Sequence, residues 1–223
     1  MKGLRKKIRM RPYLRWLLVF SNWLFQGIIH ADKTEKIYKI LFSIISIFFF
    51  FSVYVICFKM PLGLSILAGA FSGHTLNWLL NCNFYVIVVH RLYLSHFDKQ
   101  NAFNYLDSLA DRLQTNQSIL YATAHGSICT GNLKSSSDID VALVRTKGFE
   151  NALCALFFVT REKKIADLKG IPLEIYLIDN PGAALDRFKA EQNPVAIYDP
   201  KNTVDLYYSA KMTIAEAKKL NGL

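Results

Sequence analysis

A chain of 223 residues can form one large domain or two small ones, so length alone does not decide the number of domains. The formal charge of +10 is unevenly distributed: residues 1–99 contain 13 Lys and Arg against 3 Asp and Glu, whereas residues 100–223 contain 14 of each. The positive charge flanks apolar segments, which favours membrane topology over nucleic-acid binding as its origin. The four cysteines are widely spaced, which disfavours a disulfide framework or a structural zinc site.

The first apolar segment, Trp16–Ile29, follows the basic stretch Met1–Arg15 and is short for a span that needs about 20 residues. The polar residues in and before it share one side of a helical wheel: Arg11, Arg15, Asn22 and Gln26. We therefore predict an amphipathic helix over residues 12–30 that lies in the membrane interface, with Trp16 and Trp23 at headgroup depth. A signal peptide has the same layout, but no small-residue cleavage site follows and longer apolar segments come next.

Two further segments, Ile40–Phe58 and Met60–Val89, carry no formal charge, and Pro61 and Gly63 break the chain between them. They predict two antiparallel transmembrane helices over residues 40–58 and 62–89. Basic residues precede the first helix and follow the second, and the connecting turn has only Lys59. The positive-inside rule then predicts a multi-pass protein of the cell (inner) membrane, with the N-terminus and residues 100–223 in the cytoplasm.

The second predicted span carries small or polar residues at every fourth position: Ser65, Gly69, Gly73, Asn77 and Asn81. This spacing lets helix backbones approach closely and favours helix packing or a homo-oligomer through this face. Alternatively, Asn77 and Asn81 line a polar groove with His74 and bind a lipid head group.

From residue 100 the sequence pattern is that of a globular domain, which gives two domains, 1–99 and 100–223. Apolar spacing predicts helices over 102–114, 149–167, 183–190 and 214–220. Short apolar or alternating runs predict strands over 119–124, 138–144, 172–178 and 195–198.

Asp138 and Asp140 begin one of these strands, and side chains two residues apart on a strand point the same way. Two adjacent carboxylates repel, and a divalent cation relieves the repulsion. Mg²⁺ prefers such oxygen ligands, and Mn²⁺ is an alternative. If the strand at 172–178 is a neighbour, Glu174 joins the aspartates as a third metal ligand or as a general base. Two metals about 3.5–4 Å apart then activate an acceptor hydroxyl and stabilise a leaving pyrophosphate.

Gly126 and Ser127 follow the strand at 119–124 and predict a phosphate-binding turn. Gly126 allows a phosphate to approach because it lacks a Cβ, and Ser127 offers a hydroxyl. Lys134 in the following loop is a candidate for additional positive charge at this nucleotide site.

A Gly-Ser pair, ten intervening residues and then Asp138-Ile139-Asp140-Val141 resemble the signature of the DNA polymerase β-like nucleotidyltransferase superfamily, and the small minimal nucleotidyltransferases in particular. The resemblance covers roughly Ala102–Pro200. It implies an α/β (α+β) fold with a mixed sheet flanked by helices, and Mg²⁺-dependent transfer of a nucleoside monophosphate from an NTP. It also implies that Asp138, Asp140 and Glu174 are the catalytic metal ligands and that Ser127 binds phosphate. Asp179, at the end of the strand, is an alternative to Glu174.

Only about 25 residues follow Tyr198, too few for the helical domain with which larger members of this superfamily grip RNA, tRNA or an antibiotic. A nucleic-acid substrate is therefore disfavoured. Three hypotheses remain. The chain is an enzyme that modifies a lipid-linked, sugar or protein acceptor at the lipid bilayer, a membrane-tethered antitoxin-like enzyme acting on a protein partner, or a non-catalytic nucleotide-binding scaffold. Retention of the acidic residues and of Gly126-Ser127 argues against the third.

Overall fold

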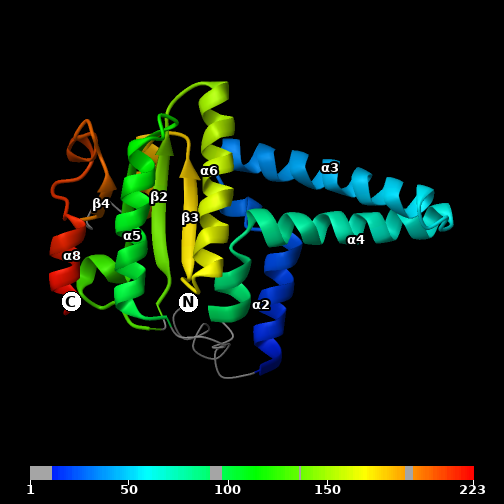
Figure 1. The fold of residues 1–223 in the computed structure, drawn as a ribbon, viewed down its shortest axis with the longest axis horizontal. Coiled ribbons are helices and arrows are strands. Elements are labelled where there is room, and N and C mark those ends of the chain that lie inside the picture. The colour runs from blue at the N-terminus through cyan, green and yellow to red at the C-terminus, as the bar shows by residue number, and fades with distance from the viewer. Residues whose placement is uncertain (1–11, 91–96, 136, 189–192) are drawn as a thin grey trace. The chain divides into compact units, whose positions relative to one another are not determined.

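The computed structural model describes residues 12–90, 97–135, 137–188 and 193–223 (Figure 1). The chain divides into two compact units, Met1–Leu92 and Tyr93–Leu223, which we describe separately. The first unit is helical and the second is built on a sheet. The protein is therefore of the α+β class, with a helical region ahead of a mixed four-stranded sheet.

The described part of the first unit, residues 12–90, contains the α-helices α2 (Pro12–Phe25), α3 (Lys33–Ile56) and α4 (Leu62–Asn81) and the short helical turns η1 (Ile28–His30) and η2 (Val86–His90). Helices α3 and α4 lie side by side as a hairpin (Figure 1). Their backbones approach so closely that a Cβ added to Gly73 would lie 2.4 Å from the backbone nitrogen of Ile47. A Cβ on Gly69 would lie 2.9 Å from the nitrogen of Phe51. The small residues of α4 therefore serve helix packing within one chain.

Polar side chains meet inside this helical unit rather than on its surface. The Asn77 amide donates to Gln26 Oε1 at 2.6 Å and to the Lys39 carbonyl oxygen at 3.0 Å. Lys39 is itself buried, forms an ion pair with Glu35 at 2.9 Å and donates to the Gln26 carbonyl oxygen. This network ties the end of α2 to the facing ends of α3 and α4. Lys39, one of the basic residues before the first predicted span, is thus buried within the unit.

The polar residues that we predicted on one side of helix α2 contact α4. Asn22 accepts a hydrogen bond from the Trp78 indole at 2.8 Å, and the Gln26 amide donates to the His74 carbonyl oxygen at 2.7 Å. The indole of Trp23, expected at headgroup depth, donates to Thr75. A polar stripe on a helix can be satisfied by a neighbouring helix as well as by headgroups, and the helical wheel does not distinguish the two. Arg11 and the side chain of Arg15 lie outside the described residues.

The two predicted membrane spans are shown only in part. Among the described helices, α3 alone is long and apolar enough to cross a membrane, with a mean hydropathy of 2.3 over its most apolar window. Only 11% of that window is buried, whereas the core helix of a soluble protein is mostly buried. Helix α4 ends at Asn81, where we predicted a span to residue 89. One apolar helix near the N-terminus fits a membrane anchor or a signal sequence.

The second unit contains a four-stranded sheet with the strand order β3-β2-β1-β4. Its strands are β1 (Ile119–His125), β2 (Ile139–Arg145), β3 (Leu173–Ile178) and β4 (Val195–Tyr198). Strand β2 pairs with β1 antiparallel and with β3 parallel, so the sheet is mixed, as predicted (Figure 1). Its helices are α5 (Lys99–Gln114), α6 (Phe149–Leu168), α7 (Pro181–Phe188) and α8 (Ile214–Leu220), with short turns η3 (Gly126–Thr130) and η4 (Val204–Leu206). Residues 189 and 190 of one predicted helix lie outside the described residues.

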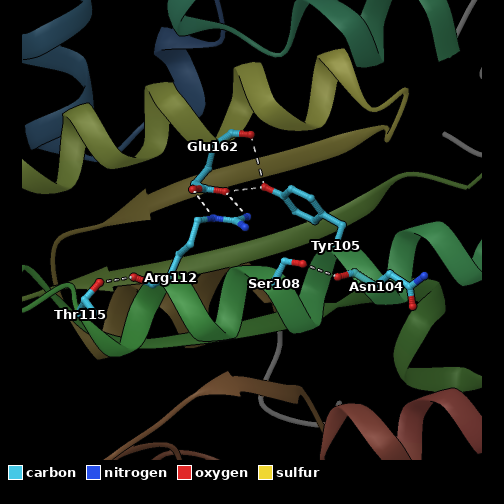
Figure 2. Close-up of polar contacts among 6 residues, drawn as sticks. All are labelled: Asn104, Tyr105, Ser108, Arg112, Thr115 and Glu162. Atoms are coloured by element: carbon cyan, nitrogen blue, oxygen red, sulfur yellow. Dashed lines mark hydrogen bonds and ion pairs between the residues drawn. The ribbon is translucent and has the colours of Figure 1, made fainter.

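The two faces of the sheet have different covers. Side chains alternate along each strand, so Tyr121, Ala142 and Ile178 share one face. There they form a buried cluster with Ala184 of α7 and with Tyr208 after η4. Helices α5 and α6 lie over the opposite face (Figure 2). Helix α7 is short and covers only part of the face that carries Tyr121, Ala142 and Ile178, and polar residues occupy the rest of this face.

A buried ion pair joins α5 to α6 (Figure 2). Arg112 donates through Nε to Glu162 Oε1 at 2.8 Å and through a terminal nitrogen to Oε2 at 2.7 Å. The Tyr105 hydroxyl adds a bond to Oε2 at 3.0 Å, and the Glu162 side chain is 0% exposed. Burial, and then the charge of Glu162, raises the pKa of Tyr105, so this hydroxyl remains a donor.

Candidate functional site

The register of the parallel strands places Asp140 and Glu174 side by side. Asp140 on β2 pairs directly with Glu174 on β3. On its other side Asp140 pairs with His125, the last residue of β1. All three residues occupy equivalent positions on adjacent strands, so their side chains share the face that α7 covers in part. The condition under which we expected Glu174 to join the aspartates, adjacent strands, is met.

Gly126 follows β1 and lies against the Asp140 carboxylate. Its φ of +80° is in the left-handed region, which glycine adopts without strain. A Cβ at this position would lie 3.2 Å from Asp140 Oδ2, which is tighter than ordinary van der Waals contact. The glycine of the predicted phosphate-binding turn therefore borders the Asp140 carboxylate, where any side chain would crowd it.

The other predicted site residues, Ser127, Asp138 and Lys134, lie in or next to the segments that flank β1 and β2. Ser127 follows Gly126 in η3 and is half-buried, and Asp138 is half-buried one residue before β2. Lys134 is an exposed residue of the loop that leads to β2. Its backbone N–H donates to the Ser137 hydroxyl at 3.1 Å, which holds the loop backbone in place. The role of its ammonium group in binding phosphate stays a prediction.

Asp179, the alternative to Glu174, lies at the other end of the parallel strands. It accepts a hydrogen bond from Arg145 Nε at 2.7 Å and forms an ion pair with this residue. Arg145 is the last residue of β2, whereas Asp140 is the second. The strand register therefore places Glu174, and not Asp179, beside Asp140.

His125 is a buried member of the site for which we predicted no role. Its ring stacks on Phe188 of α7 with a centroid distance of 4.1 Å and an interplanar angle of 11°. Its Nε2 lies 2.9 Å from the Thr123 hydroxyl, and its Nδ1 is buried without a hydrogen-bond partner among the described residues. Burial lowers the pKa of His125 from 6.5 to about 4, so the ring is neutral at pH 7.

Tyr176 places a hydroxyl next to the two carboxylates. It lies two residues after Glu174 on β3, and its hydroxyl donates to Glu174 Oε2 and lies 3.5 Å from Asp140 Oδ1. The guanidinium of Arg187 lies 4.2 Å from the centre of the tyrosine ring, and Phe188 packs edge-on against it. Burial, and then the charges of Glu174 and Asp140, raises the pKa of Tyr176, so the hydroxyl keeps its proton.

The chemistry of these groups fits a hard divalent cation better than a transition metal that needs His or Cys ligands. Asp140 and Glu174 are oxygen donors on neighbouring strands, and one hydroxyl oxygen already lies close to both. Mg²⁺ commonly uses one or two carboxylates together with substrate phosphates. Within the described ranges, however, no three His, Cys, Asp or Glu side chains are grouped closely enough to hold a metal ion. Participation of Asp138 as a third ligand therefore remains a prediction.

The three strand residues of the site that we did not predict, Thr123, His125 and Tyr176, share a simple sequence signal with Glu174. Thr123 and His125 are two residues apart on β1, and Glu174 and Tyr176 are two residues apart on β3. The side chains of each pair therefore point to the same face of the sheet. Extending the period-two argument from Asp140 to both neighbouring strands would have placed these four side chains together. Arg187 and Phe188 carry no comparable signal, because their approach depends on how α7 packs on the sheet.

Comparisons with known proteins add no assignment: no family model matches the chain, and no characterised protein is significantly similar to it.

Proposed function

We propose that this chain is a divalent-metal-dependent nucleotidyltransferase anchored to a membrane. The observation that carries the proposal is the direct pairing of Asp140 with Glu174 on parallel strands, with Gly126 packed against the Asp140 carboxylate. The resemblance of Gly126-Ser127 and Asp138-Ile139-Asp140 to the polymerase β-like signature gives this acidic pair its reaction class. The mixed four-stranded sheet is compatible with that class.

In the proposed reaction, an acceptor hydroxyl oxygen forms a bond to the α-phosphorus of an NTP while the bond to the bridging oxygen of the β-phosphate breaks and pyrophosphate leaves. Asp140 and Glu174, with Asp138, would hold Mg²⁺ or Mn²⁺, which when bound neutralises phosphate charge. Gly126 leaves room for a phosphate, and the Ser127 hydroxyl can donate to a phosphate oxygen. The proton of the acceptor passes to a carboxylate, for which Glu174 is our candidate.

The membrane part of the proposal is supported by the surface of the helical unit. Its exposed side chains include many large apolar residues, on α2, α3 and α4 alike: Trp16, Phe20, Ile45, Phe48, Leu67 and Phe71. So many exposed large apolar side chains are unusual for a soluble protein and suit contact with lipid. We propose that α3 and α4 both cross the bilayer and that the second unit lies in the cytoplasm. A membrane-associated acceptor, such as a lipid-linked sugar or polyol, would then be within reach.

The enzymatic proposal is tested by incubating the detergent-solubilised chain with each α-³²P-labelled NTP, Mg²⁺ and a membrane extract. We expect a labelled product that Asp140→Asn and Glu174→Gln each reduce at least about a hundredfold, as loss of a catalytic group commonly does. Asp179→Asn is the matched control, because it removes a carboxylate from the other end of the same strands. Failure of every NTP to label a product, or equal labelling by Asp140→Asn, would contradict the proposal.

The topology is tested with two native cysteines, Cys57 and Cys154, both of which are exposed. Cys57 follows α3 next to the predicted outer turn, and Cys154 lies in α6 of the second unit. In intact cells, a membrane-impermeant maleimide should label Cys57 but not Cys154, and permeabilisation should add Cys154. Labelling of both residues in intact cells would place the second unit outside, and labelling of neither would mean that the turn does not reach the outer surface.

A further inference from the structure

The position of Tyr176 has a consequence for any cation that binds the carboxylate pair. The tyrosine hydroxyl donates to Glu174 and lies 3.5 Å from Asp140 Oδ1. It therefore lies close to an oxygen of each carboxylate, where a cation shared by the two would have to bind. A hydroxyl proton compensates the negative charge of two carboxylates only in part, whereas a divalent cation compensates it fully.

The tyrosine ring is held in this position from the side of α7. Arg187 lies over one face of the ring at 4.2 Å, and Phe188 packs against it with a centroid distance of 5.6 Å. On β2 the residue opposite Tyr176 is Ala142, whose small side chain leaves room for the ring on the sheet. Helix α7, rather than the strand alone, therefore determines where the hydroxyl points.

We propose that Tyr176 is a latch: in the metal-free protein its hydroxyl closes the Asp140–Glu174 pair, and a divalent cation must displace it to bind. This inference rests on the proposed function, because it takes the pair to be the metal site. It adds that metal affinity is limited by a competing hydrogen bond. The hold of Arg187 and Phe188 on the ring links that affinity to the position of α7.

The opposite role for Tyr176 makes an opposite prediction. If the hydroxyl only oriented Glu174 for metal binding, its removal would loosen the ligand and weaken binding. If it competes with the metal, its removal tightens binding. A hydrogen bond to a charged group is strong enough for its loss to raise metal affinity about tenfold.

The test measures the Kd of Mn²⁺ alone for the full chain in detergent, by electron paramagnetic resonance of the free ion. We expect Tyr176→Phe to lower this Kd about tenfold, and Asp140→Asn to abolish binding in both backgrounds. Tyr207→Phe is the control, since Tyr207 is an exposed tyrosine outside strands β2 and β3, and it should leave the Kd unchanged. If Tyr176→Phe does not fold, Phe188→Leu, which loosens the hold on the ring without changing the charge near the carboxylates, should lower the Kd by a smaller factor.

The outcomes separate the latch from the proposed function. An unchanged or raised Kd in Tyr176→Phe, with binding that still depends on Asp140, overturns the latch and leaves the metal site standing. Binding by Tyr176→Phe but not by the wild type supports a latch of higher strength. Absence of Mn²⁺ binding at millimolar concentrations in both proteins contradicts the metal site and the latch together.

Discussion

The ion pair between Arg112 and Glu162 makes a quantitative prediction about the stability of the second unit. Arg112→Leu removes two short hydrogen bonds, of 2.8 and 2.7 Å, from a carboxylate that is 0% exposed. Breaking a buried ion pair from one side costs about 3–5 kcal/mol, because a buried charge loses its partner. The Tyr105 hydroxyl stays bonded to Glu162, and the Arg112 side chain is 22% exposed, so we expect a value near the lower limit. For a unit of this size, ~3 kcal/mol lowers Tm by about 10 °C.

The assay follows each unit of the full chain separately. All three tryptophans lie in the helical unit, so their fluorescence reports that unit and serves as the internal control. Unfolding of the second unit is followed by the reaction of Cys129 with a maleimide, read by mass spectrometry of the labelled peptide. Cys129 is buried, and burial raises the pKa of its thiol to about 11, so it reacts slowly until the unit unfolds. The exposed Cys154 reacts throughout.

A double variant shows whether the cost arises from an unpaired charge. Arg112→Leu/Glu162→Leu removes both charges and should recover most of the lost stability, to within about 1 kcal/mol of the wild type. If Arg112→Leu changes the Tm of the second unit by less than 2–3 °C, or if the double variant is as unstable as the single one, the argument is refuted. A shift in tryptophan fluorescence instead of Cys129 labelling would also contradict it.

Three other predictions concern single positions. Gly73→Ala should destabilise the helical unit, because the added Cβ would lie 2.4 Å from the α3 backbone, and the tryptophan melting curve should shift to lower temperature. Gly63→Ala is the control, because its Cβ would meet no atom within 4 Å, and it should leave that curve unchanged. Gly126→Ala should destabilise the second unit by about 1 kcal/mol, because a residue with a side chain must then adopt the left-handed backbone conformation. It should also weaken Mn²⁺ binding, because the added Cβ crowds the Asp140 carboxylate. Unchanged Mn²⁺ binding would contradict the close approach of Gly126 to Asp140. His125, with a folded pKa of about 4 against 6.5, binds its proton more readily when unfolded. The second unit should therefore lose about 3 kcal/mol between pH 6.5 and 4 relative to His125→Gln, and parallel pH profiles would refute this.

The elements of the second unit follow from local sequence patterns. The predicted strands at 172–178 and 195–198 and the helix at 149–167 agree with the structure to within one residue at each end. Their apolar periods match the period of the element that forms, so each segment carries its own signal. Which strands become neighbours is not a local property. The sequence left the pairing of Glu174 with Asp140 as a condition, and only the register of the sheet decides it.

The period-two pattern places Tyr176 on the same face as Glu174, but the contacts of the aromatic and basic residues around the pair could not be predicted, for a related reason. Tyr176 is an ordinary strand residue by composition, and its contact with Glu174 depends on where its ring is held. Arg187 and Phe188, which hold it, lie on a short helix whose packing on the sheet has no period that the sequence displays. Sequence spacing thus places candidate ligands on strands, while the groups that control them come from tertiary contacts.

The low hydropathy of α4 has a structural explanation that bears on the proposed topology. A hydropathy average counts every side of a helix equally, but only its exposed side would meet lipid. The polar members that lower the average, including Ser65, Asn77 and Asn81, are buried within the unit. Exposed positions such as Leu67 and Phe71 are apolar. A helix that turns its polar side to a partner can therefore lie in a bilayer with a composition that an isolated span could not have. The hydropathy of α4, which is lower than that of α3, therefore follows from its packing on α3. If α3 and α4 both cross the bilayer, the turn that carries Cys57 lies on the outer surface, and the labelling of Cys57 in intact cells tests this directly.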